Sequence, residues 1–123
     1  MGTNPVKWFE LYVHDMKRAR EFYEQVFQVE LQRLDSEQPE LYAFPMNDGQ
    51  YGAAGALARM EGVEPGGCGT IVYFHCDDCA VEAERLGQAG GRIVREKMSI
   101  GQYGFIALGY DTEGNLIGLH SMV

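Results

Sequence analysis

Two polar residues, Glu10 and His120, lie in otherwise apolar segments near opposite ends of the 123-residue chain. A carboxylate beside an imidazole can act as an acid–base pair, because histidine exchanges its proton near neutral pH. The same two side chains could instead be two ligands of a metal site. In the alternative interpretation, Glu10 is a structurally paired carboxylate and His120 is held by a backbone carbonyl. The sequence leaves open whether the two side chains meet.

A single Cys-x-x-C motif, Cys76 to Cys79, could indicate redox chemistry or zinc binding. The motif has no second pair, and it spans the end of a predicted strand and the start of a predicted helix. Cysteine often serves at such buried positions as a small apolar side chain. We therefore favour a structural role for both cysteines. His14 and His75, at the ends of two predicted strands, are expected at the surface.

The spacing of apolar residues predicts the same series of elements twice. Asp15 is placed to cap a helix whose apolar residues recur at helical spacing as far as Phe27. The predicted strands cover 6–13, 29–34, 40–45, 53–60, 69–76, 92–97, 104–110 and 116–121, and the predicted helices cover 16–27 and the segment from Asp77 or Asp78 to about 89. Each half therefore reads as strand, helix and three strands.

Sliding the sequence by 62 positions places Leu31 on Ile93 and the segment 52–57 on 114–119. Such a repeat indicates two copies of one supersecondary unit that share one core. We predict a single domain over 1–123, with repeat 1 at about 6–60, a linker at about 61–68 and repeat 2 at about 69–123. The segment 101–104, which contains two glycines, is either a turn or a loop that closes over a ligand.

The first predicted strand has one wholly apolar side, which we expect under the helix. The residues that alternate with it face the other way, toward a cavity between the repeats. The 62-residue shift then assigns three residues of the second repeat to the same cavity. The predicted ligand-binding set is Trp8, Tyr12, Thr70, Val72 and Phe74, with Glu10 and His120 as the candidate catalytic residues. Aromatic walls suit a flat or apolar small molecule, although simple core filling is the alternative.

Composition excludes several classes of function. The formal charge is −8, from 18 acidic and 10 basic residues, and this charge repels nucleic acids and anionic membrane surfaces. The apolar runs are strand-sized, so no membrane span is predicted. An odd number of cysteines and the lack of a visible signal peptide favour a cytoplasmic protein.

These features resemble the vicinal oxygen chelate superfamily, which includes glyoxalase I, bleomycin-resistance proteins and extradiol dioxygenases. The resemblance rests on the repeat and on the motifs Trp8-Phe9-Glu10 to Asp15, Phe22-Tyr23 and Asp111-x-x-Gly114-Asn115. It covers essentially the whole chain. It implies an α+β fold in which two βαβββ repeats form a curved, partly open eight-stranded sheet around a cup.

The resemblance also implies where a metal would bind, because metal-using members take ligands from the first and last strands of each repeat. These positions fall on Trp8, Thr70, Ala56 and Gly118. None offers a good ligand atom for a transition metal. We therefore expect no cofactor, unless the ligands are shifted by two residues, which would bring in Glu10 and His120.

Two functions from different classes are consistent with these residues. The first is a metal-independent binding protein for a small, partly aromatic molecule. The second is an enzyme, either a metal-dependent lyase, isomerase or dioxygenase with shifted ligands or an acid–base catalyst that uses Glu10 and His120. The resemblance further implies a homodimer, in which the pocket is completed at the subunit interface.

Overall fold

The computed structural model describes residues 4–47, 49–67 and 69–123. Asp48, which follows the predicted strand 40–45, and Cys68, at the end of the predicted linker, lie outside these residues. The first half contains β1 (Trp8–Tyr12), α1 (Met16–Phe27), β2 (Gln32–Arg33), β3 (Glu40–Ala43) and β4 (Ala54–Arg59). The second half contains β5 (Val72–His75), α2 (Cys79–Gln88), β6 (Arg92–Ser99), a 3-10 turn η1 (Gly101–Tyr103), β7 (Phe105–Tyr110) and β8 (Leu116–Ser121). The predicted α+β class and the twofold βαβββ order are confirmed.

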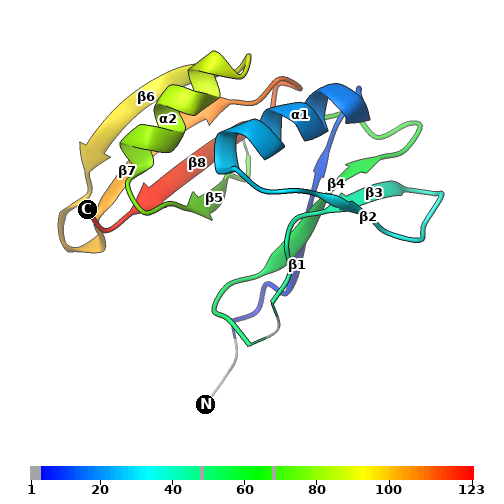
Figure 1. Cartoon of the computed structure of the whole chain (residues 1–123), viewed down its shortest axis with the longest axis horizontal. Coiled ribbons are helices and arrows are strands. Elements are labelled where there is room, and N and C mark those ends of the chain that lie inside the picture. Colours follow the sequence, from blue (N-terminus) through cyan, green and yellow to red (C-terminus); the bar gives the residue numbers. More distant parts are fainter. Residues whose placement is uncertain (1–3, 48, 68) are drawn as a thin grey trace.

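The strands form two four-stranded sheets with the orders β1-β4-β3-β2 and β5-β8-β7-β6. In each sheet the first strand pairs parallel to the last strand of its half, and the other pairs are antiparallel. Within the described ranges, no strand of one sheet pairs with the other, so the expected eight strands are divided between two sheets. The helices lie side by side, each over its own sheet (Figure 1). Among the described residues, neither helix has the length and apolar character needed to span a bilayer.

The sequence explains where both helices begin. The Asp15 carboxylate accepts a hydrogen bond from the backbone N–H of Arg18, and the Asp78 carboxylate accepts one from the N–H of Ala80. This contact decides between the two caps predicted for the second helix. The apolar side of α1 is buried as predicted, through Met16, Ala19, Phe22, Tyr23 and Val26.

One hydrophobic core joins the two halves. Phe74 of β5 is partly buried and packs against this core. Its ring contacts four aromatic rings of the first half, those of Phe9, Tyr23, Phe27 and Phe44. The Phe74 and Phe27 rings stack with their centroids 4.5 Å apart. Helix α1 therefore packs on strand β5 of the opposite half as well as on its own sheet.

The repeat is offset by 63 residues at its start and by 62 at its end. The helix caps Asp15 and Asp78 are 63 residues apart, as are the buried strand ends Val13 and Cys76. Strands β4 and β8, however, begin 62 residues apart. Helix α2 has 10 residues whereas α1 has 12, and the segment between the helix and the last strand restores one of these two positions in the second half. The constant shift of 62 is thus wrong for the first strand of each repeat.

The corrected register changes which residues are equivalent. Trp8, Glu10 and Tyr12 correspond to Ile71, Tyr73 and His75, and not to Thr70, Val72 and Phe74. A shift of one residue exchanges the two faces of a strand. Accordingly, Val72 and Phe74 face the helix side, because their partners on β8, Ile117 and Leu119, are fully buried core residues.

Candidate functional site

The outward face of the first sheet, which points away from the helices, brings together the three residues predicted for β1. Trp8 Nε1 donates to Glu10 Oε2 at 3.1 Å, and the Tyr12 hydroxyl donates to Glu10 Oε1 at 3.0 Å. Burial and this bond to Glu10 raise the pKa of Tyr12. Both oxygens of Glu10 therefore have partners on the same strand. The three side chains form one small polar cluster on an exposed surface.

The outward face of the second sheet borders a groove with a volume of about 1010 Å³. Its apolar lining consists of Phe9, Val72, Phe74, Ile100 and Ile106. Its polar lining consists of Gln50, Tyr51, Tyr73, His75 and His120, and the small residues Gly52 and Ala53 complete it. The groove therefore has hydrophobic walls with few polar groups, which is typical of small-molecule sites.

His120 lies in this groove, beside His75 on the neighbouring strand. His120 Nε2 lies 2.6 Å from the backbone carbonyl oxygen of Tyr103. The contact ties β8 to the 3-10 turn η1, within the segment that the sequence marked as a turn or a loop over a ligand. His120 is thus held by a backbone carbonyl, as the alternative interpretation expected.

The structure does not bring Glu10 and His120 together within one chain. They belong to different sheets, Glu10 is bonded to Trp8 and Tyr12, and only His120 lines the groove. Val72 and Phe74 line the groove from the core-facing side of β5, whereas Thr70 is exposed before that strand and is not part of the lining. The predicted ligand-binding residues therefore fall in two places.

The positions to which the family resemblance assigns metal ligands do not suit a metal ion here. A Cβ atom added to Gly118 would collide with the ring of Tyr73, which occupies the space that a ligand side chain would need. Ala56 is fully buried, and Ile71, the corrected equivalent of Trp8, has no ligand atom in its side chain. Over residues 4–47, 49–67 and 69–123, no three His, Cys, Asp or Glu side chains are grouped to hold a metal ion.

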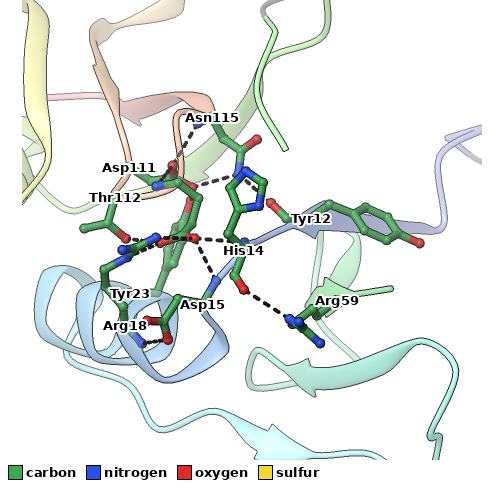
Figure 2. A network of polar contacts seen from close by, with 10 residues as sticks. Tyr12, His14, Asp15, Arg18, Tyr23, Arg59, Asp111, Thr112 and Asn115 are labelled. Carbon is green, nitrogen blue, oxygen red and sulfur yellow. Dashed lines mark hydrogen bonds and ion pairs between the residues drawn. The ribbon is translucent and has the colours of Figure 1, made fainter. Parts of the chain in front are cut away.

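The Asp111-x-x-Gly114-Asn115 motif joins the two repeats (Figure 2). The Tyr23 hydroxyl donates to Asp111 Oδ2 at 2.6 Å, and Asn115 Nδ2 donates to the backbone oxygen of Tyr12 at 2.9 Å. Asp111 also accepts hydrogen bonds from the backbone N–H groups of Glu113 and Asn115. Burial and the nearby Asp111 raise the pKa of Tyr23 well above its usual value, so this hydroxyl remains a donor. The motif is therefore a structural joint between α1, β1 and the β7–β8 turn.

Glu113, inside the same motif, holds the start of α1. Its carboxylate accepts hydrogen bonds from the backbone N–H groups of His14 and Asp15, at 2.9 and 3.0 Å. Arg18 donates to both carboxylate oxygens, at 2.7 and 3.0 Å. Sequence reasoning predicted only a turn here and missed this role. No local feature of the sequence signals this role, because the burial of Glu113 is not evident from the turn and its partner Arg18 is 95 residues away.

Both cysteines of the Cys-x-x-C motif are free and buried. Burial, followed by the nearby Glu82, raises the pKa of the Cys76 thiol to about 12. The structural interpretation of Cys76 is therefore favoured over redox chemistry, because the thiolate is the reactive form.

We expect Cys76 to resist alkylation by iodoacetamide at pH 8 in the folded protein. With a pKa of about 12, roughly one thiol in ten thousand is ionised at that pH. Labelling of a Cys68→Ser variant, followed by mass spectrometry of the peptides, scores Cys76 and Cys79 separately. The same protein in 6 M guanidinium is the control and should label quickly. Rapid labelling of Cys76 in the folded protein would contradict this account.

The sequence pattern of the Glyoxalase/Bleomycin resistance protein/Dioxygenase superfamily matches residues 6–119, and the chain belongs to this superfamily. No curated protein sequence matches the chain.

Solved structures agree with this assignment at the level of the fold. Glyoxalase I from Zea mays superposes with a TM-score of 0.72 at 23% identity, over 95% of this chain and 46% of the maize chain. The present chain thus spans about half the length of that relative. TnmS3, an antibiotic-binding protein from Streptomyces sp. CB03234, gives 0.69 at 21% identity over 100% and 99% of the two chains. A glyoxalase-related enzyme from Fulvimarina pelagi gives 0.71 at 18% identity over 97% and 88%.

Proposed function

We propose that this chain is a small-molecule-binding protein that takes a partly aromatic ligand without the metal used by many relatives. The groove beside β5 carries the proposal, since it combines aromatic and aliphatic walls with a few polar groups. The chemistry of Trp8, Ala56, Ile71 and Gly118 supports the absence of a metal, because these side chains provide no adequate ligand set. The likeness to TnmS3, which is described as binding an antibiotic, is a further support.

We also propose that the functional form is a homodimer. Each sheet has a helix on one face only, and the outward faces leave large aromatic side chains exposed, with Trp8 at 37% and Tyr73 at 46%. A second copy would cover these faces. The acid–base alternative requires Glu10 of one chain to reach His120 of the other, because the two side chains are not brought together within one chain. Buried free thiols at Cys76 and Cys79 accord with a reducing compartment, and we propose the cytoplasm.

Two measurements test the proposed function. Elemental analysis of protein purified without chelator should find less than one tenth of an equivalent of Ni, Zn, Mn or Fe. A thermal-shift screen of small aromatic compounds should find ligands that raise the melting temperature, because binding to the folded state stabilises it.

A matched pair of variants locates the site. Ile106→Asp places a charge in the groove wall and should abolish the ligand-induced rise. Val94→Asp places the same charge at an exposed position of β6 outside the groove lining and should preserve it. A stoichiometric metal would overturn the metal-free proposal. Equal ligand responses in the two variants would overturn the assignment of the groove.

A further inference from the structure

We propose that the groove selects planar aromatic ligands that carry a neutral hydrogen-bond donor, such as a phenolic hydroxyl, and that this donor binds Nδ1 of His120. This inference rests on the proposed function, because it names the class of ligand for the same groove. It follows from the groove walls, from the hydrogen bond of His120 and from the absence of charge in the lining.

The walls favour a flat ring. Phe9 of β1 and Phe74 of β5 contribute their rings from opposite halves of the chain, 6.0 Å apart and nearly perpendicular. Ile106 provides an aliphatic surface from β7. An aromatic ligand can therefore contact the face of one ring and the edge of another, which are the arrangements that aromatic pairs prefer.

The hydrogen bond of His120 fixes where its proton lies. The partner of Nε2 is the carbonyl oxygen of Tyr103, and a carbonyl oxygen can only accept. Nε2 therefore carries the hydrogen. In the neutral imidazole the other nitrogen, Nδ1, is then an acceptor. No described residue donates to Nδ1, so a ligand donor can meet an acceptor that is already oriented by the bond to Tyr103.

The charge of the lining excludes the obvious competitors. None of the described residues that line the groove is Asp, Glu, Lys or Arg. A carboxylate or an ammonium group on the ligand would lose water there without gaining an opposite charge, which is costly. A neutral hydroxyl group loses less hydration free energy on entering the groove, and it gains a hydrogen bond to His120.

His75 is the natural comparison, since it lines the same groove on the neighbouring strand. The His75 side chain is 83% exposed. Its Nε2 lies 3.8 Å from Oδ1 of Asp77, a residue that is not part of the groove lining. Among the described residues, no backbone carbonyl accepts a hydrogen bond from its ring and orients it. We therefore assign the recognition of the donor to His120 alone.

The test compares 2-naphthol with 2-methoxynaphthalene, which keeps the rings and lacks the donor. Isothermal titration calorimetry at pH 7.5 should show that the wild-type protein binds 2-naphthol about fivefold to tenfold more tightly, the usual range for one hydrogen bond between neutral groups. His120→Phe should remove this preference while retaining affinity for both rings. His120→Gln, whose amide can donate to Tyr103 and still accept, should retain most of it. His75→Ala should leave the preference unchanged, and 2-naphthoate should bind more weakly than 2-naphthol.

The outcomes separate this inference from the proposed function. Equal affinities of the wild-type protein for 2-naphthol and 2-methoxynaphthalene would overturn the role of His120 and leave an aromatic-binding groove. A preference that survives in His120→Phe, or tighter binding of 2-naphthoate than of 2-naphthol, would also overturn it. Failure of every probe to bind, with circular dichroism showing folded protein, would overturn the inference and the proposed aromatic groove together.

Discussion

Replacing Glu113 with alanine should lower the free energy of unfolding by about 3 kcal/mol, a large share of the stability of a domain of this size. The Glu113 side chain is 0% exposed, and it accepts hydrogen bonds from His14, Asp15 and Arg18. Alanine leaves two backbone N–H groups and the guanidinium without their acceptor. Urea denaturation followed by circular dichroism measures the loss.

The control for this substitution is Glu64→Ala. Glu64 is 75% exposed and pairs with His14 at 3.6 Å, so its removal should change the free energy of unfolding by about 0.5 kcal/mol or less. Glu113→Gln keeps the size and some of the hydrogen bonds but loses the charge, and we expect an intermediate value. If Glu113→Ala costs no more than Glu64→Ala, Glu113 does not hold the two repeats together.

The features that could be predicted from the sequence are those set by neighbours along the chain. The start of α1 follows from Asp15, and its buried side follows from the spacing of Ala19, Phe22 and Val26. The cluster of Trp8, Glu10 and Tyr12 was predicted to share one face because residues two apart on a strand do so. Its hydrogen bonds agree with that prediction.

The register of β5 could not be predicted, because its sequence gives no alternation to read. Val72 and Phe74 are apolar, and Tyr73 between them is aromatic, so either face could be the buried one. The choice is made by Phe74, which packs against Phe27 and Phe44 of the other repeat. These contacts are distant in the sequence, and the shorter α2 hides them further by changing the offset of the repeat.

The role of the Asp111 to Asn115 turn was missed for a similar reason. Its partners Tyr12, Tyr23 and Arg18 are between 88 and 103 residues away. A turn with Asp, Gly and Asn has a sufficient local explanation, so nothing in the pattern demands distant contacts. The contribution of the segment 50–53 to the groove was missed as well, because the repeat does not place this segment beside β5.

The second large effect is a loss of stability in acid. Burial alone would raise the pKa of Glu113, but the hydrogen bonds from Arg18, Asp15, Thr112 and His14 lower it from 4.5 to about 2. The folded state thus binds the proton less tightly than the unfolded chain does. The contribution of this carboxylate is therefore complete above about pH 4.5 and disappears as the pH falls toward 2.

The difference between these pKa values corresponds to about 3 kcal/mol. Urea denaturation at pH 7, 5, 4, 3 and 2.5 should show the wild-type stability falling most steeply below pH 4.5. The Glu113→Gln variant should lose less over the same range, since it has no proton to bind at this position. The pKa of Asp78 is lowered by its hydrogen bond with Lys97. Asp78 is partly exposed and is present in both proteins, so its smaller effect on the free energy of unfolding cancels in the comparison. Parallel pH profiles for the wild type and Glu113→Gln would mean that the folded state does not specifically stabilise the carboxylate of Glu113. The contacts between the β7–β8 turn and α1 would then be weaker than their geometry indicates.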